Sequence, residues 1–344
     1  MIFGKHQYRL SLTWSEWLRF LGLKGAAKPV DAFLLLQSLI APAKRLPEKP
    51  LPIDASALDK LFGRPESQWL QEVEDSTGVH VMRKYGLAVK SCPLEALRQF
   101  GTEDELLCPE VLAMQLARKH TSIPVPRVHR VLPTEVEPEL HWIGGTTNYW
   151  LVMHYIPGEL LGIVWPRLSI WRKLWVVITL CRYVKELRKV LQPFDGHLGR
   201  ISTDGEPLRC DLPGLFERSE KFSSYDALKT DYNNRWKSRG EDGRSCYADP
   251  NPLAFIHGDL HKFNIILGED GQLWLIDWGY SGFYPRWFEY RRMFIMGSFQ
   301  KVDGRVIQFQ DHTWQLLAGI ICDYDPWTLA WYRQLYNVCR NVRQ

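Results

Sequence analysis

Four polar residues within one short stretch have the types and the spacing that phosphate transfer requires. The stretch FIHGDLHKFNIILGEDGQLWLIDWG spans residues 255–279 and contains His257, Asp259, Asn264 and Asp277. An amide and a carboxylate can hold Mg²⁺ on phosphate groups, and a second carboxylate can take the proton of an attacking hydroxyl. The ordered pattern H-x-D-x-x-x-x-N, followed by D-W-G, therefore predicts a site for phosphoryl transfer.

A predicted hairpin is the element that must position the two metal-binding candidates. Residues 265–267 and 273–276 are apolar, and the sequence GEDG between them ends in Asp-Gly, a favoured turn pair. Folding the chain back at this turn places Asn264, which precedes the first strand, beside Asp277, which follows the second. The sequence therefore predicts two oxygen ligands at the mouth of the hairpin, where a hard cation such as Mg²⁺ can bind.

The loop before this hairpin carries the candidate base. Asp259 lies five residues before Asn264, so it can face the same space without binding the metal, and it is interpreted as the catalytic base. His257 is expected to brace the loop by hydrogen bonding, and His261 is either an acceptor-side contact or a polar surface residue. The alternative interpretation of the whole stretch is an ordinary hairpin with solvated polar ends, which the combined pattern disfavours.

The remaining pattern predicts strands around one helix, followed by a mainly helical part. Before the site we expect a hairpin within 78–92 that turns at Tyr85-Gly86, a helix over 108–120, and strands within 123–132 and 148–156. Pro-Gly-Glu at 157–159 then interrupts the pattern. A long helix over 170–191, a loop-rich region at 192–250 and, beyond the hairpin, helices to the C-terminus follow. Two short helical patterns and a third near ASALDKLF precede residue 75.

A C-terminal stretch allows two interpretations. The sequence CDYDPWTLAWYRQLY spans 322–336, and its Asp-Pro pair predicts the start of a helix. Trp327, Trp331 and Leu335 recur on one face of that helix, and Asp323 precedes it. We interpret the aromatic residues as the core side of an amphipathic helix; the alternative is an aromatic pocket for an organic cation.

The composition is that of a soluble globular protein. The chain has 344 residues, 45% hydrophobic and 24% charged, enough for one large domain or two lobes. Its 43 basic and 39 acidic residues leave a charge of +4, too small to indicate nucleic acid as a partner. The seven cysteines are scattered without a C-x-x-C pair. No signal segment and no run of about 18 apolar residues is found, so we expect a cytoplasmic protein without a membrane span.

Several stretches resemble one known family. HGDLHKFNIIL and LIDWGYSGFYPRWFEY, supported by LAVK, TSIPVPRV and YWLVMHYIPGELL, resemble the aminoglycoside phosphotransferase and choline kinase-like superfamily, and most of all its fungal-type small-molecule kinases. The resemblance covers roughly residues 76–300. It implies an α+β, bilobal protein-kinase-like fold, with a small mainly β N-lobe, a larger mainly helical C-lobe and ATP between them. The chain then divides into an N-terminal helical extension (1–75), a nucleotide-binding N-lobe (76–156) and a C-lobe with the catalytic loop and the acceptor site (157–344).

The resemblance also implies which residues bind the nucleotide. Lys90 in LAVK would pair with the α- and β-phosphates, and Glu110 would hold Lys90 by an ion pair. Met153 in MHYI would border the adenine, and the backbones of His154 and Ile156 would hydrogen-bond it. Without the downstream motif, Lys90 would be interpreted as a surface lysine at a strand end, and Glu110 as an acid that favours a helix N-terminus.

Two features depart from the pattern of the family. Many fungal relatives have D-W-E where this chain has Asp277-Trp278-Gly279, and a small residue there is compatible with metal binding. No G-x-G-x-x-G precedes Lys90, so the segment DSTGVHVMRKYG must cover the phosphates with a different loop.

Together these features predict a small-molecule kinase. Such an enzyme uses ATP and Mg²⁺ to transfer the γ-phosphate to a hydroxyl of a small organic molecule, such as a natural-product intermediate. The alternative is a catalytically silent, kinase-like nucleotide-binding protein. A protein kinase is disfavoured, because only WGYSGFYPRWF separates Asp277 from Glu289 and no A-P-E follows.

The expected partner is a small-molecule hydroxyl acceptor, with no nucleic acid, membrane or protein partner. The charge of +4 disfavours a polycationic aminoglycoside as that acceptor, because its pocket should be strongly acidic. An apolar or aromatic natural product, an amino alcohol and a sugar all stay open as acceptors.

Overall fold

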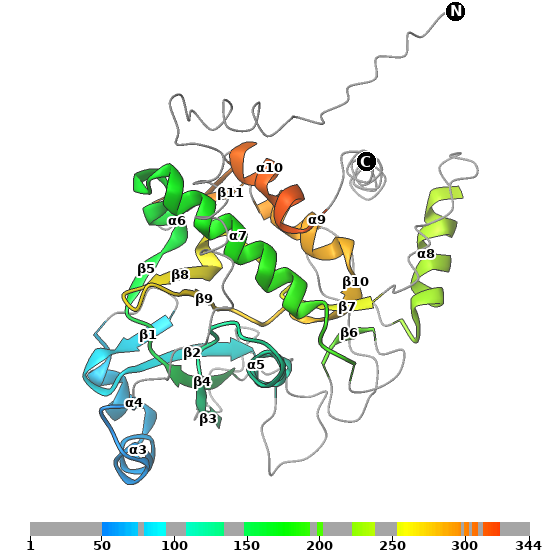
Figure 1. Cartoon of the computed structure of the whole chain (residues 1–344). Helices are drawn as coiled ribbons and strands as arrows, with labels where there is room; N and C mark the ends of the chain where they lie inside the picture. The colour runs from blue at the N-terminus through cyan, green and yellow to red at the C-terminus, as the bar shows by residue number, and fades with distance from the viewer. Residues whose placement is uncertain are drawn as a thin grey trace, which may run out of the picture.

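A computed structural model describes ten segments of the chain: residues 50–74, 79–93, 108–133, 148–192, 198–201, 222–237, 253–296, 299–302, 305–308 and 312–323. The two helical patterns expected before residue 50, and the aromatic stretch beyond Asp323, lie outside these segments. The described elements form a small lobe around a four-stranded sheet and a larger lobe in which helices pack over short strands (Figure 1). This arrangement confirms the predicted α+β, bilobal protein-kinase-like fold.

The small lobe is built on an antiparallel sheet. Its strands, in spatial order, are β1 (Val79–Met82), β2 (Leu87–Pro93), β4 (Asn148–His154) and β3 (Val128–Pro133). β1 and β2 form the predicted hairpin, which turns through a 3₁₀ segment (Arg83–Tyr85) and Gly86. Gly86 has a φ of 66°, a left-handed conformation that glycine adopts without a steric penalty.

Both faces of this sheet are buried, because successive side chains of a strand point to opposite sides. The outer face packs against α3 (Ala55–Phe62) and α4 (Glu66–Trp69), which a 3₁₀ turn (Leu70–Glu72) follows. The strand residues in this outer cluster include Leu87, Val89, Trp150 and Val152. Trp69 of α4 packs edge-on against Trp150, with ring centroids 5.4 Å apart. Helix α3 consists of ASALDKLF, as predicted.

The inner face packs against α5 (Pro109–His120), the helix predicted over 108–120. Pro109 lies in its first turn, where the missing N–H leaves no helical hydrogen bond unmade. Val111 and Met114 of α5 belong to the same apolar core as Ala88 of β2 and Met153 of β4. The inner face therefore carries both the main core and, between Ala88 and Cys92, the side chain of Lys90.

The larger lobe consists mainly of helices. α7 (Ile170–Leu187) is the predicted long helix, and the side chain of Ser169 caps its N-terminus by accepting from Arg172 N. α9 (Trp287–Met296) and α10 (His312–Ile321) lie beside it, while α8 (Tyr225–Lys237) stands apart in Figure 1. Within the described residues, no helix is both long and apolar enough to cross a membrane.

Short strands of the larger lobe support the predicted site. β6 (Gly199–Arg200), β10 (Gly282–Pro285) and β7 (Leu253–Ile256) form one small sheet, and β5 (Gly158–Leu160), β8 (Ile265–Gly268) and β9 (Leu273–Leu275) form another. Between β5 and α7 lie the short α6 (Leu161–Val164) and a 3₁₀ turn (Trp165–Arg167). A further 3₁₀ turn (Lys262–Asn264) leads into β8.

Three expectations about the elements are corrected. Pro-Gly-Glu does not end the strand pattern, because β5 begins at Gly158, directly after the proline, and pairs with β8. The strand expected from 123 begins only at Val128, because Pro124 and Pro126 have no N–H for a sheet. β11 (Phe299–Val302) and β12 (Arg305–Gln308) pair where helices alone were expected. They flank Asp-Gly, a favoured hairpin turn pair that is the local signal for these two strands.

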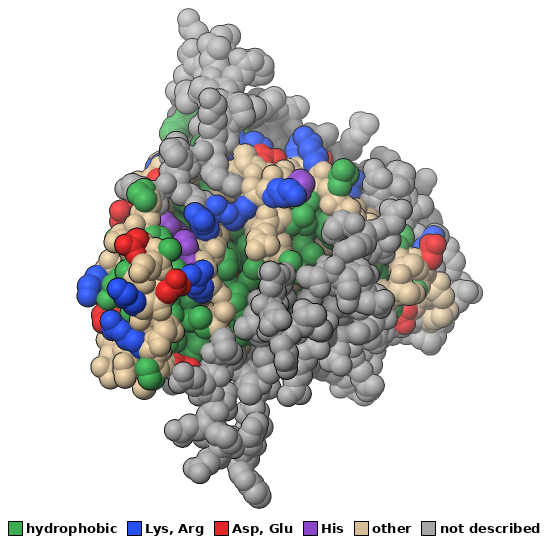
Figure 2. Space-filling view, turned by 90° about the horizontal axis from the view of Figure 1, so that it is seen from below, with side chains coloured by type: hydrophobic (Ala, Val, Ile, Leu, Met, Phe, Trp, Pro, Cys, Tyr) green, Lys and Arg blue, Asp and Glu red, His purple; other side chains and the backbone are tan. Residues whose placement is uncertain are grey.

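Charged side chains of both signs share the face of the molecule that Figure 2 shows from below. Surface ion pairs of the small lobe include Arg83 with Glu74, at 3.2 Å, and Lys84 with Glu72, at 3.8 Å. This mixture agrees with the small net charge.

Residues 50–74 share a core with the N-lobe sheet; the domain boundaries after 75 and 156 stay predictions.

Candidate functional site

The predicted hairpin exists and brings its two polar ends together. β8 and β9 pair antiparallel, with Ile265 opposite Leu275. At the mouth of the hairpin, Ile276 N donates to Asn264 O over 3.0 Å. Asn264 therefore lies against the residue that precedes Asp277, as the turn chemistry predicted.

Asp277 lies at a strained point of the backbone. Its φ is 63°, in the left-handed region that non-glycine residues seldom enter, although Asp does so more often than most. Such conformations persist where the surrounding structure holds them, and they gather at functional sites. The strain therefore supports, independently of the motif, a functional position for this carboxylate.

The ammonium of Lys90 joins three separate elements. Its Nζ lies 2.9 Å from each carboxylate oxygen of Glu110 on α5 and 2.7 Å from Oδ1 of Asp277. Glu110 also accepts from the backbone N–H of Trp278, at 3.3 Å. Burial disfavours the charged ammonium, but Glu110 and Asp277 outweigh burial and raise the pKa of Lys90 above its ordinary value. Lys90 is therefore not a surface lysine at a strand end, and Glu110 does more than favour a helix N-terminus.

The candidate base Asp259 is buried and heavily hydrogen-bonded. Its Oδ2 accepts from Asn264 Nδ2 at 2.9 Å, and its Oδ1 accepts from Arg292 Nη2 at 2.5 Å. Burial disfavours the carboxylate, but a hydrogen bond from His261 and the charge of Arg292 hold the pKa of Asp259 below its usual range. Asp259 is therefore a stable carboxylate at neutral pH.

The orientation of the Asn264 amide follows from its partners. Nδ2 donates to both the side chain and the backbone carbonyl of Asp259, at 2.9 and 3.0 Å. Since both partners are acceptors, only the NH₂ group can face them. The amide oxygen is therefore the atom of Asn264 that a cation can use.

His257 braces the loop, as expected from the sequence. Its Nδ1 accepts from Asp259 N at 3.3 Å, so its proton is on Nε2, which donates to Ile276 O at 3.1 Å. Burial lowers the pKa of His257 to about 4, which keeps the ring neutral. One imidazole thus ties the loop of Asp259 to the segment that ends in Asp277.

His261 lies beside the candidate base rather than on the open surface. Its Nδ1 accepts from Phe263 N at 3.1 Å, which puts the ring proton of the neutral form on Nε2. That Nε2 lies 3.5 Å from Oδ2 of Asp259, and 12% of the side chain is exposed. This position favours the acceptor-side interpretation of His261.

Two residues of α9, Glu289 and Arg292, complete the site and were not among the residues proposed from the sequence. Glu289 accepts from His257 N at 2.6 Å and from Gly258 N at 3.4 Å. Arg292 Nε donates to Gly258 O at 3.0 Å. The sequence offered one signal for this pair. Glu289 and Arg292 are three positions apart, so on a helix they lie on the same face.

The predicted hinge lies at the end of β4. Met153 and Ile156 are buried, and Met153 lies opposite Ala88 in the register of β2 and β4. The N–H of His154 donates to Arg127 O at 2.8 Å, which ties the end of β4 to the segment before β3. Ala88 and Lys90, two residues apart on β2, face the same side, so Met153 and Lys90 share one surface.

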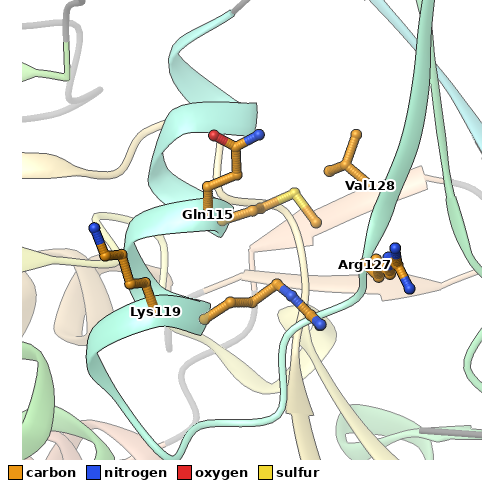
Figure 3. Close-up of a pocket in the computed structure, with 6 residues that line it drawn as sticks. Gln115, Lys119, Arg127 and Val128 are labelled. Atoms are coloured by element: carbon orange, nitrogen blue, oxygen red, sulfur yellow. The ribbon is translucent and has the colours of Figure 1, made fainter.

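A separate pocket lies between α5 and β3. It has a volume of about 350 Å³ and is lined by Met114, Gln115, Arg118, Lys119, Arg127 and Val128. Figure 3 shows Gln115 and Lys119 on α5 across from Arg127 and Val128. None of the site residues proposed from the sequence lines this pocket.

Residues 85–319 match the phosphotransferase enzyme family. Since this match spans more than half of the chain, the protein belongs to that family, and its resemblance to the aminoglycoside phosphotransferase and choline kinase-like superfamily is confirmed. The narrower likeness to fungal-type kinases stays a prediction. No curated protein matches the sequence.

The solved structures that match this chain share little sequence identity with it. A type VIII aminoglycoside-3'-phosphotransferase is 21% identical, covers 74% of this chain and 84% of its own, with a TM-score of 0.38. An amicoumacin kinase in complex with AMP-PNP, Ca²⁺ and its ligand is 12% identical. The match covers 82% of this chain and 78% of that chain, with a TM-score of 0.38. A spectinomycin phosphotransferase in complex with ADP and spectinomycin is 10% identical, covers 78% of each chain, with a TM-score of 0.41.

Proposed function

We propose that this phosphotransferase is an ATP- and Mg²⁺-dependent kinase of a hydroxyl group on a small organic molecule. The observation that carries the proposal is the position of the Lys90 ammonium, 2.9 Å from Glu110 and 2.7 Å from Asp277. Membership of the family supports the reaction class. The hydroxyl acceptor, the use of ATP and a cytoplasmic location are all parts of this proposal.

The nucleotide would lie along the inner face of the small-lobe sheet. The adenine would border Met153 and hydrogen-bond the backbones of His154 and Ile156. Lys90 would bind the α- and β-phosphates, held in place by Glu110. Because Glu110 is 6% exposed and bonded to Lys90 through both oxygens, the ammonium is fixed before a ligand arrives.

The residues at the hairpin mouth fit Mg²⁺. The free amide oxygen of Asn264 and the carboxylate of Asp277, whose side chain is 42% exposed, are hard oxygen donors of the kind that Mg²⁺ prefers. When bound, the metal would neutralise the phosphates and orient them for transfer. Asp277 would hold the metal, and Asn264 would supply the second protein ligand.

Asp259 would orient the acceptor hydroxyl and take its proton. As the hydroxyl oxygen bonds to the γ-phosphorus, the bond to the β-phosphate oxygen breaks, ADP leaves and the proton passes to the carboxylate. A carboxylate with a lowered pKa is a weak base, so its first contribution is orientation, with proton transfer late in a loose transition state.

Two alternatives are weaker. A catalytically silent nucleotide-binding protein has no need for Asp259, yet this residue is present and held by Asn264 and Arg292. A protein kinase needs a peptide-docking stretch after the metal-binding Asp. Here β10 starts at Gly282 and α9 at Trp287, which leaves little chain for such a stretch.

The proposal is tested by measuring ADP formation from ATP and Mg²⁺ against a chemically diverse library of alcohols, with mass spectrometry of the products. Asp259→Asn serves as the matched control in every well. We expect phosphorylated products with the wild-type protein only. Nucleotide-dependent thermal stabilisation without turnover of any acceptor would support the silent alternative instead.

A further inference from the structure

Helix α9 holds the catalytic loop through two side chains that are one turn apart. Glu289 accepts from the backbone N–H of His257, at 2.6 Å, and Arg292 Nε donates to the carbonyl of Gly258, at 3.0 Å. Glu289 is 0% exposed and Arg292 is 4% exposed. Two buried hydrogen bonds thus fix the backbone before Asp259 to helix α9. The backbone donates in the first bond and accepts in the second.

Arg292 makes a second contact with the candidate base itself. Its Nη2 lies 2.5 Å from Oδ1 of Asp259, a buried charge-assisted hydrogen bond. The guanidinium is planar, so Nε and Nη2 keep a fixed separation and direction. Because one rigid group binds Gly258 O and Asp259 Oδ1 together, it fixes the rotation of the Asp259 side chain relative to its own loop.

The consequence concerns which oxygen of Asp259 can meet a substrate. Oδ1 is covered by Arg292, whose guanidinium carbon lies 5.5 Å from the centre of the Tyr280 ring. Oδ2 accepts from Asn264 Nδ2 and lies 3.5 Å from His261 Nε2. A hydrogen bond at 3.5 Å is weak, so a substrate hydroxyl can take the place of His261 at the second acceptor position of Oδ2.

We infer that Arg292 is a positioning residue that turns Oδ2 of Asp259 towards the acceptor hydroxyl. The inference rests on the proposed function for its catalytic consequence, but the orientation of Asp259 is a property of the protein alone. A lysine is not equivalent to this arginine, because its ammonium lacks the planar fork that holds Gly258 O and Asp259 Oδ1 at a fixed separation.

The first test compares Arg292→Lys with Arg291→Lys, which changes the neighbouring buried arginine of the same helix in the same way. We expect kcat of Arg292→Lys to fall by about 10²-fold, the effect of a misplaced reacting group, with an unchanged KM for ATP. Arg291→Lys is expected to keep the wild-type kcat. A folded Arg292→Lys protein with the kcat of wild type overturns the inference.

A double-mutant cycle separates positioning from a general structural effect. If Arg292 acts through Asp259, then Arg292→Met lowers kcat strongly in the wild type and less than about 2-fold in Asp259→Asn, because interacting residues are not additive. The combined variant also has no unpaired charge at either position, which protects its fold. Equal losses of kcat in both backgrounds overturn the inference.

A spectroscopic measurement tests the orientation without any turnover. In protein labelled with ¹⁵N at asparagine, the side-chain NH₂ signals of Asn264 report its bonds to Asp259. We expect these signals to shift in Arg292→Lys and to stay in place in Arg291→Lys. Unchanged signals in Arg292→Lys refute the positioning role, whereas a shift in a protein that phosphorylates no acceptor refutes only the proposed function.

Discussion

Lys90 Nζ lies 2.7 Å from Oδ1 of Asp277, although 187 positions separate the two residues in the chain. The same ammonium is bonded to both oxygens of Glu110. The pair therefore connects the small-lobe sheet, helix α5 and the end of the β8–β9 hairpin. In the proposed function, Lys90 would stay held by Glu110 and bind the phosphates, and Asp277 would exchange its bond to Lys90 for the metal.

Asp277→Ala is expected to abolish Mg²⁺-dependent binding of an ATP analogue. The amide of Asn264 alone cannot hold the cation against its hydration, because Mg²⁺ gives up water reluctantly. Asn264→Ala should weaken the binding less, since the carboxylate remains. Calorimetry with and without Mg²⁺ measures both effects. Equal losses of the metal-free binding would show that the fold, rather than a metal site, had been damaged.

Lys90→Met is expected to raise the KM for ATP or to lower kcat, and to leave the KM for the acceptor unchanged. It should also lower the free energy of unfolding by about 1–3 kcal/mol, because the buried carboxylate of Glu110 loses its partner. Adding Glu110→Gln to Lys90→Met removes that unpaired charge and should restore stability but not activity. Urea unfolding and steady-state kinetics separate the two effects, and wild-type kinetics in Lys90→Met would assign the phosphates to another cation.

Asp259→Asn keeps the size of the candidate base and removes its charge. We expect kcat to fall by about 10²–10⁴-fold, the usual contribution of a general base. Binding of the ATP analogue should persist, because Asp259 contacts Asn264 only through the NH₂ group and not through the oxygen proposed to bind the metal. Near wild-type turnover in this variant would contradict the mechanism.

Glu289 is expected to contribute a fall in stability between about pH 4.5 and pH 7, opposite in sign to the rise that the lowered pKa of His257 contributes up to about pH 6.5. Burial raises the pKa of Glu289 from its ordinary value of 4.5 to about 7, although backbone N–H groups of His257 and Gly258 donate to it. In this window the folded protein holds a proton that the unfolded chain has lost, so a rising pH favours unfolding. The contribution of Glu289 to the free energy of unfolding is complete below pH 4.5 and lost above pH 7.

The control for this pH dependence is Glu289→Gln, which keeps the shape and cannot titrate in that range. Urea unfolding at a series of pH values from 5 to 8 should show the stability of the wild type falling relative to that of the variant. Parallel curves for the two proteins would assign the pH dependence to other groups.

Trp69→Ala is expected to destabilise the small lobe. Trp69 is 3% exposed and packs edge-on against Trp150 on the outer face of the sheet. Removing a buried aromatic side chain costs about 3–5 kcal/mol. Trp171→Ala, at a position that is 44% exposed on α7, is the matched control and should change stability little. Chemical unfolding measures both, and equal stability of the two variants would contradict the role of α3 and α4 as a cover of the sheet.

The sequence by itself determined the local parts of this protein. The β8–β9 hairpin, the turn at Gly86 and the helices α3, α5 and α7 follow the predicted patterns. Each depends on residues close together in the chain: a turn pair, a proline in a first helical turn, a regular spacing of apolar residues. For the same reason the neighbourhood of Asn264 and Asp277 could be predicted, since twelve residues of hairpin connect them.

Local patterns were weaker where tertiary pairing decided the outcome. Gly158–Leu160 looks like a break, yet it becomes a strand because β8 offers it an edge. The sequence contains no local sign of that edge. Trp150 and Met153 likewise face opposite cores, which no count of apolar residues could show before α3, α4 and α5 were in place.

Only the tertiary structure decided how the loop of the candidate base Asp259 is held. Arg292 reaches Asp259 across 33 positions and Glu289 reaches His257 across 32, through hydrogen bonds that exist only when α9 packs against the loop. A motif in sequence identifies residues that do chemistry, because their types and spacing are constrained by the reaction. The residues that orient them can come from any element whose packing brings a suitable donor or acceptor within about 3 Å, and that distance is decided by the fold of the whole chain.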